Sequence, residues 1–174
     1  MSDVTQLQQA QTVVKQWKEE GKTVVFTNGC FDLLHPGHID YLNRAAALGD
    51  VLIIGLNDDA SVRRLKGAAR PVNPLQDRAI MLAALRAVDL VVPFAEDTPL
   101  QLISTLMPDI LVKGGDYQPD EIVGADVVRQ AGGQVIVMPF IDGFSSTKLL
   151  QRIQTINNAC IQHSSTYYAP PLHR

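Results

Sequence analysis

Five short runs of apolar residues recur along the chain, separated by segments whose apolar residues are spaced three or four positions apart. The first run is the sequence TVVFT at 23–27, and the others lie at 51–56, 90–94, 110–113 and 134–140. Runs that are apolar throughout are typical of strands buried on both faces, and their alternation with helices is typical of a parallel sheet. The pattern therefore predicts a three-layer α/β fold with a parallel sheet of about five strands.

The intervening segments carry helical spacing together with start and stop signals. Leu7, Ala10 and Val14 share one face of a helix predicted for 1–21, which Gly21 would end. Asn73-Pro74 is a strong helix start, because Asn caps well and Pro suits the first helical position. Helices are predicted at 37–49, 60–65, 73–87, 98–107, 123–131 and 145–156.

The C-terminal residues break this alternation. Residues 157–174 are polar, show little helical periodicity and contain Pro170-Pro171. We therefore expect a single domain at 1–156, followed by a loose tail at 157–174. A length of 174 residues suits one domain.

Composition narrows the class of protein. The chain is 46% hydrophobic and 19% charged, which is typical of an ordered globular domain, and its net charge of -3 argues against binding to nucleic acid or a membrane surface. The only cysteines, Cys30 and Cys160, exclude a disulfide framework and a four-thiolate zinc site. The N-terminus has no signal-peptide pattern, and no apolar run approaches the roughly 18 residues of a membrane helix, so we expect a cytoplasmic protein.

The segment after the first apolar run contains a candidate anion site. His35 and His38 flank Pro36-Gly37, and the second histidine opens a predicted helix. The helix would present free backbone N–H groups, and Gly37 would let a ligand approach the backbone closely. The arrangement suits a phosphate, although a capped turn with packed histidines would have the same sequence.

A second candidate anion site follows the fifth run. Ser145, Ser146, Thr147 and Lys148 combine hydroxyl donors and a positive charge at a helix start, where simple Ser/Thr capping is the alternative. Ligands of open parallel sheets bind at the carboxyl ends of the strands, so the two sites would share one edge and suit a polyphosphate. Neither a Walker A loop nor a dinucleotide fingerprint is present.

Several segments between about residues 22 and 153 resemble the cytidylyltransferase-like nucleotidyltransferases. They are TNGCFDLLHPGH, GDVLIIGLNDDASVRRLKG, RPVNP, EDTP, PDILVKGGDY and GFSST. The HxGH pattern is shared by the family, and the combination with LKG, RPVNP and LVKGGDY resembles its bacterial heptose branch. The resemblance implies a Rossmann-like nucleotidyltransferase fold. It also implies transfer of AMP from ATP to D-glycero-D-manno-heptose 1-phosphate, giving ADP-heptose and pyrophosphate for lipopolysaccharide core synthesis.

The resemblance also implies roles for individual residues. The implied catalytic residues are His35, His38, Lys66 and Lys148. The implied nucleotide-binding residues are Thr27, Asn28, Gly29, Phe31, Asp32, Gly37, Asn57, Gly114, Asp116, Ser145, Ser146 and Thr147. The implied substrate-binding residues are Lys66, Arg70 and Asn73. Without the resemblance, solvated loop charges would be the simpler interpretation of Lys66 and Arg70.

Partners and competing functions complete the expectations. The resemblance implies a homodimer. We expect Mg²⁺ with ATP, because the metal commonly bridges the oxygens of a triphosphate, and we expect no metal held by protein side chains, because no cluster has zinc-ligand spacing. Many members of the family are fused behind a sugar kinase, but only about twenty residues precede the first apolar run here, so we expect the heptose 7-phosphate kinase to be a separate protein. One alternative is a cytidylyltransferase acting on glycerol 3-phosphate or a similar small phosphate. That branch has Arg-Thr-Glu before the Ser/Thr motif, whereas this chain has Ile141-Asp142-Gly143. Another alternative is a nucleotide-binding regulatory module without turnover.

Overall fold

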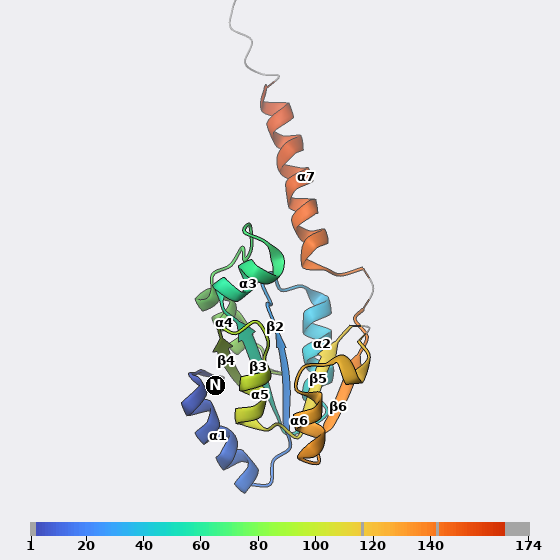
Figure 1. Ribbon diagram of the computed structural model, residues 1–174. Helices are drawn as coiled ribbons and strands as arrows, with labels where there is room; N and C mark the ends of the chain where they lie inside the picture. Colours follow the sequence, from blue (N-terminus) through green and yellow to red (C-terminus); the bar gives the residue numbers. More distant parts are fainter. Residues whose placement is uncertain (1–2, 116, 142, 166–174) are drawn as a thin grey trace, which may run out of the picture.

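The computed structural model describes residues 3–115, 117–141 and 143–165, which form a parallel sheet with helices on both sides (Figure 1). The strands are β1 (Asp3–Val4), β2 (Val24–Gly29), β3 (Val51–Asn57), β4 (Leu90–Phe94), β5 (Ile110–Gly114) and β6 (Gln134–Met138). The α-helices are α1 (Leu7–Glu19), α2 (Pro36–Ala46), α3 (Asp59–Lys66), α4 (Leu75–Ala83), α5 (Leu100–Leu106), α6 (Ala125–Gln130) and α7 (Ser146–Ser165). A 3-10 turn, η1, spans Pro119–Glu121.

All strand pairs are parallel, and the sheet has the order β1-β4-β3-β2-β5-β6. β2 lies next to β3 on one side and next to β5 on the other. After β2 the chain adds β3 and β4 on one side of it, and then β5 and β6 on the other side. This reversal makes the carboxyl ends of β2 and β5 the topological switch point, where ligands of such sheets bind.

Alternate residues of the central strands enter two separate cores. Val24 and Phe26 of β2 pack on one face with residues of α1, α5 and α6. Val25 packs on the other face with residues of α2 and α4. Burial on both faces is the reason that these strands are apolar throughout. The predicted three-layer α/β fold is confirmed, with β1 as an additional short edge strand.

The N-terminal expectation needs one correction. Residues 1–21 were expected to be helical, but Asp3 and Val4 form β1, which pairs with Leu90 and Val91 of β4, and α1 begins only at Leu7. The backbone N–H of Thr5 also donates to the Val91 carbonyl at 3.0 Å. A strand of two residues is too short to show an alternating pattern, so only its partner strand identifies it.

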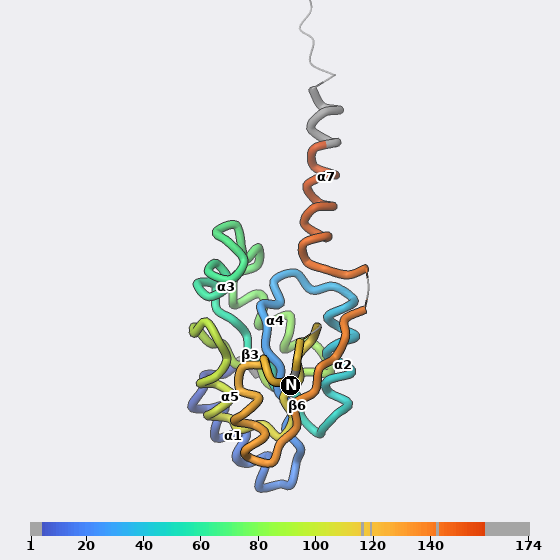
Figure 2. Tube along the Cα trace, turned by 45° about the vertical axis from the view of Figure 1, so that its right-hand side comes forward, coloured from blue at the N-terminus to red at the C-terminus, as the bar shows by residue number. Residues whose placement is uncertain are grey.

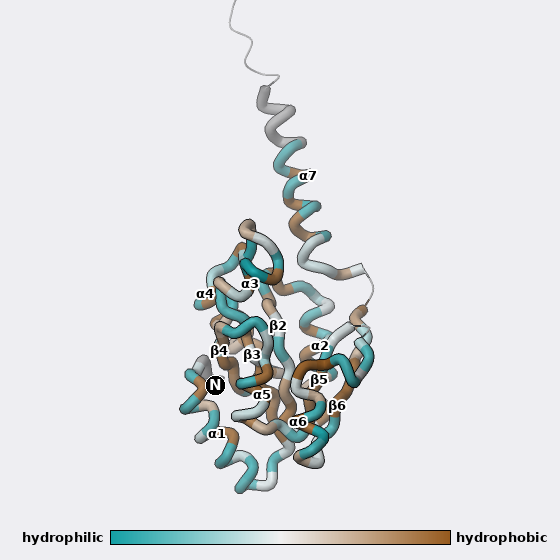
Figure 3. Tube along the Cα trace, in the orientation of Figure 1, coloured by the Kyte–Doolittle hydropathy of each residue, from teal (hydrophilic) through white to brown (hydrophobic). Residues whose placement is uncertain are grey.

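The C-terminal expectation also needs correction. The last helix was expected to end at Ile156, yet α7 continues to Ser165 and projects away from the sheet in both views (Figures 1 and 2). No Gly or Pro interrupts 146–165, so nothing in the sequence stops the helix there. Along α7, polar residues alternate with apolar ones (Figure 3), and Ile153 and Ile156 are 51% and 55% exposed. The rest of the expected tail, 166–174, lies outside the described residues.

Candidate active site

A cavity of about 650 Å³ opens at the carboxyl edge of the sheet, at the switch point between β2 and β5. Its walls come from the end of β2, the start of α2, the end of α3, the end of β5 and the start of α7. The volume falls in the range of small-molecule sites. The sheet topology therefore brings both predicted anion-binding segments to one cavity.

The HPGH segment forms the start of α2. His35 is the N-cap residue, and its Nδ1 accepts a hydrogen bond from the backbone N–H of His38 at 3.3 Å. An acceptor Nδ1 leaves the proton of the neutral ring on Nε2, which can donate to a ligand. A Cβ on Gly37 would lie 3.0 Å from Cβ of Phe144 and 3.2 Å from Nδ1 of His35, so a larger residue would crowd the segment.

The two histidines stack on each other and resist protonation. Their ring centroids are 3.7 Å apart, with 16° between the planes. Burial, with a smaller contribution from the neighbouring His35, lowers the pKa of His38 to about 4, and burial also lowers the pKa of His35. Both rings are therefore neutral near pH 7. A neutral imidazole can offer a ligand a hydrogen-bond donor but no positive charge.

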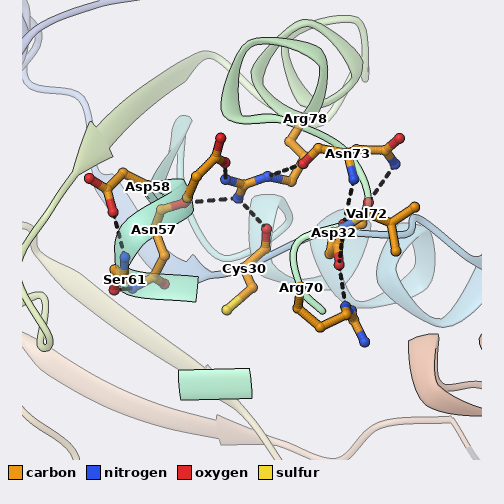
Figure 4. A network of polar contacts seen from close by, with 10 residues as sticks. Cys30, Asp32, Asn57, Asp58, Ser61, Arg70, Val72, Asn73 and Arg78 are labelled. Carbon is orange, nitrogen blue, oxygen red and sulfur yellow. Dashed lines mark hydrogen bonds and ion pairs between the residues drawn. The ribbon is translucent and has the colours of Figure 1, made fainter. Parts of the chain in front are cut away.

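Asp32 holds the loop between α3 and α4 against the cavity. It forms an ion pair with Arg70 and accepts backbone hydrogen bonds from Val72 at 2.8 Å and Asn73 at 2.9 Å (Figure 4). Burial alone would raise the pKa of Asp32, but these donors outweigh burial and hold the pKa below its ordinary value. Asp32 is therefore an anion that fixes Arg70 at the cavity wall.

Arg78 is the largest fully buried side chain among the described residues, and it joins the segments beneath the cavity. It donates to the carbonyls of Cys30 at 2.7 Å, Asn57 at 2.8 Å and Asn73 at 3.0 Å (Figure 4). It also pairs with the carboxylate of Asp59 at 2.7 Å. One guanidinium thus joins the ends of β2 and β3 to α3 and to the loop before α4.

The start of α7 lies against the HPGH loop. Ser146 donates its hydroxyl to the Leu33 carbonyl at 3.1 Å, and Ser145 caps the helix by accepting from the backbone N–H of Lys148 at 3.1 Å. Capping by Ser145 was the simpler alternative for this segment, and it is present. The sequence did not predict the hydrogen bond to Leu33, which brings the start of α7 beside the start of α2.

Most of the predicted site residues line the cavity. They are Asn28, Gly29, Phe31, Asp32, His35, Gly37, His38, Asn57, Lys66, Arg70, Gly114, Ser145, Ser146 and Thr147. Three predicted residues are not in its lining. Thr27 is buried and shares a hydrogen bond of 2.7 Å with the Tyr41 hydroxyl, Asn73 bonds to Asp32, and Lys148 is exposed. Asp116 lies outside the described residues.

Sequence reasoning missed other residues of this region. Cys30, Lys113 and Tyr117 also line the cavity, and Arg78 lies beneath it. Burial raises the pKa of the Cys30 thiol, so the thiol stays protonated near pH 7. The position of Arg78 could have been recognised from the sequence, because it shares the inward face of its helix with Leu75, Ala79 and Leu82. A charge at such a position indicates a buried hydrogen-bonding role.

The fold and the site together define an α/β protein of the nucleotidyltransferase type, with a cavity at the switch point and two helix starts facing it. The family model of cytidylyltransferase-like proteins matches residues 26–152, which is most of the chain and includes every cavity segment, so the chain belongs to the cytidylyltransferase-like family. The predicted family is confirmed.

Curated relatives share more than half of the aligned residues. The chain is 58% identical to the bifunctional protein HldE of Gluconacetobacter diazotrophicus, over 87% of this chain and 31% of that protein. It is 55% identical to the bifunctional protein HldE of Photorhabdus laumondii, over 87% of this chain and 32% of that protein. The chain therefore spans about a third of the length of the curated relatives that it matches.

Solved structures agree on the fold. A lipopolysaccharide core biosynthesis protein from Thermoplasma volcanium is 27% identical with a TM-score of 0.56, over 70% of this chain and 98% of that one. A pantoate-beta-alanine ligase from Francisella tularensis is 16% identical with a TM-score of 0.59, over 86% of this chain and 76% of that one, and shows the fold alone. Within the described part of this chain, no helix has both the length and the apolar character needed to cross a membrane.

Proposed function

We propose that the chain transfers AMP from ATP to D-glycero-D-manno-heptose 1-phosphate, giving ADP-heptose and pyrophosphate. The observation that carries this proposal is the shared cavity, where the HPGH segment and the start of α7 lie beside Lys66 and Arg70. The identity to bifunctional HldE proteins supports the heptose branch. The absence of Arg-Thr-Glu before Ser145 weighs against the glycerol 3-phosphate alternative.

The reaction is an in-line displacement at the α-phosphorus of ATP. An oxygen of the sugar phosphate forms the new bond to phosphorus, the bond from phosphorus to the oxygen shared with the β-phosphate breaks, and pyrophosphate leaves with the electron pair. Such a reaction depends on positioning and on charge stabilisation more than on a covalent intermediate. The chain's task is therefore to hold two anions in line.

The site residues would divide this task among them. The Nε2–H of His35 and the ring of His38 would donate to the phosphate oxygens on which charge develops. Free N–H groups of α2 and α7, with Ser146 and Thr147, would hold the β- and γ-phosphates. Lys66 and Arg70 would face the reacting phosphates, with Arg70 fixed by Asp32.

Mg²⁺ would enter with the nucleotide. Among the residues that the structure describes, no group of three or more His, Cys, Asp or Glu side chains is placed to hold a metal. We propose MgATP as the substrate, with the metal carried on phosphate oxygens. The chain's own residues bind and orient that complex.

The assembly and location remain part of this proposal. We expect a homodimer, and we expect the phosphorylated heptose to be supplied by a kinase. Light scattering of the purified chain at several concentrations checks the first expectation. Because ATP is the proposed substrate, we expect the protein to act in the cytoplasm.

The experiment that tests the proposal is continuous measurement of pyrophosphate release. The purified chain should release pyrophosphate with MgATP and heptose 1-phosphate together, and should release none with either substrate alone. Mass spectrometry should identify ADP-heptose as the second product. Nucleotide binding without any turnover would contradict the proposal and favour a regulatory module.

A further inference from the structure

Lys113 is a cavity residue with an unusual environment. It lies near the end of β5, directly across the switch point from the end of β2, and its ammonium donates to Oδ1 of Asn28 at 3.2 Å. The same ammonium lies 5.7 Å from the ring centroid of Tyr117. The side chain is thus directed along the floor of the cavity between the two strands at which the sheet topology reverses.

The charge of Lys113 is not balanced by the described protein. No carboxylate of the described residues lies within 4.0 Å of its ammonium, and one neutral amide oxygen uses only one of its three N–H donors. Burial lowers the pKa of Lys113, which shows that the site penalises the charged form. A partly buried cation with no carboxylate partner among the described residues is unfavourable for folding, so its presence favours an anionic ligand.

The neighbouring arginines each have a carboxylate partner, unlike Lys113 in the described part of the chain. Arg70 is neutralised by Asp32, and Arg78 is neutralised by Asp59. Lys66 resembles Lys113 instead, because it also lines the cavity and has no ion pair among the described residues. The cavity therefore presents two ammonium groups whose charge is available to a ligand.

We propose that Lys113 binds a non-bridging phosphoryl oxygen of the ligand at the centre of the cavity. Its position between β2 and β5 places it where the two reacting phosphates must meet. The oxygen belongs either to the α-phosphate of ATP or to the phosphate of the acceptor. The inference rests on the proposed function, and it assigns this contact to a residue to which the resemblance gave no role.

Calorimetric titration of Lys113→Met tests the contact without requiring turnover. Methionine keeps the length of the aliphatic stem and removes the charge. The titrants are MgATP, heptose 1-phosphate and inorganic pyrophosphate, each added alone. A charge-assisted hydrogen bond lost from a buried site should weaken binding of the contacted ligand by about 10- to 100-fold. Weaker MgATP binding with unchanged pyrophosphate binding identifies the α-phosphate, and weaker heptose 1-phosphate binding identifies the acceptor phosphate. Weaker pyrophosphate binding would place the contact on the β- or γ-phosphate and contradict this assignment.

Matched variants separate this role from a structural one. Lys113→Arg keeps the charge and should recover most of the lost affinity, whereas Lys15→Met removes a lysine that is 78% exposed and should bind like the wild type. Because a partly buried charge with no carboxylate partner among the described residues is removed, Lys113→Met should unfold at the same temperature as the wild type or higher. A structural lysine would instead lower the thermal midpoint.

The outcomes are distinct from those that test the proposed function. Weakened phosphate binding in Lys113→Met supports the contact even if the wild type shows no turnover. The absence of turnover would contradict only the proposed reaction. Affinities within twofold of the wild type for all three ligands would overturn the contact even if ADP-heptose forms. A wild type that binds none of the three ligands would overturn both.

Discussion

Replacing Arg78 with methionine should destabilise the fold strongly, because four acceptors would lose one buried donor. The carbonyls of Cys30, Asn57 and Asn73 and the carboxylate of Asp59 all bond to this guanidinium, whose exposure is 0%. Removing one partner of a buried ion pair typically costs about 3–5 kcal/mol, since the other partner is left unsatisfied. For a chain of this size each kcal/mol shifts the thermal midpoint by about 2–4 °C, so the midpoint should fall by about 6–20 °C.

The assay is urea unfolding followed by circular dichroism, with thermal unfolding as a second measure. Arg63→Met is the matched control, because Arg63 is exposed on α3 and should change the free energy of unfolding by less than about 0.5 kcal/mol. Arg78→Lys should fall between the two variants, since an ammonium cannot reach all four acceptors in the geometry of the guanidinium fork. An Arg78→Met variant within about 1 kcal/mol of the wild type would refute the view that Arg78 holds these segments together.

Three further predictions follow from the histidines and from α7. His38→Ala should keep the fold and lower kcat by ~10²–10³, as loss of one preorganised donor does, and near-wild-type kcat would contradict its role. Because the pKa of His38 falls from 6.5 to about 4 on folding, the unfolded chain binds more protons between these values, and stability should drop as pH falls from 7 to 5. In urea titrations at pH 7 and pH 5, the free energy of unfolding of His38→Gln should fall by about 1 kcal/mol less than that of the wild type, a value that allows for partial exposure of the ring. An identical pH dependence in both proteins would refute the burial argument. A chain ending at Asn157 should keep its thermal midpoint and turnover, because the truncation removes only the far end of α7, which projects away from the sheet (Figure 1), and the residues beyond it, and a loss of either would show that this segment contacts a partner.

The parts of the fold that sequence could predict are those specified by local pattern. The strands of 51–57 and 90–94 are buried on both faces, so their apolar character is continuous and easily recognised. The HPGH segment was equally visible, because Pro36 and Gly37 mark a helix start whatever surrounds them. β1 escaped detection since its two residues depend on β4 for their conformation.

The parts that sequence could not predict depend on contacts distant along the chain. Arg78 bonds to Cys30 and Asn57, and the side chain of Lys113 reaches Asn28. These residues are distant along the chain and are brought together by the strand order, in which β2 lies between β3 and β5. Their contacts can therefore be predicted only when that order is known. Asn73 is expected to contact the substrate, and that role stays a prediction; the structure adds that Asn73 bonds to Asp32 and closes the loop.

The most direct test of the proposed activity is the comparison of kcat/KM for four pairs of substrates with Mg²⁺ present. ATP and CTP are each combined with heptose 1-phosphate and with glycerol 3-phosphate. A site built to pair the hydroxyl groups of a heptose rejects a smaller polyol, because each polar group left unpaired costs about 1–3 kcal/mol. The account predicts that ATP with heptose 1-phosphate gives the highest kcat/KM of the four pairs. An equal or higher value for CTP with glycerol 3-phosphate would contradict it.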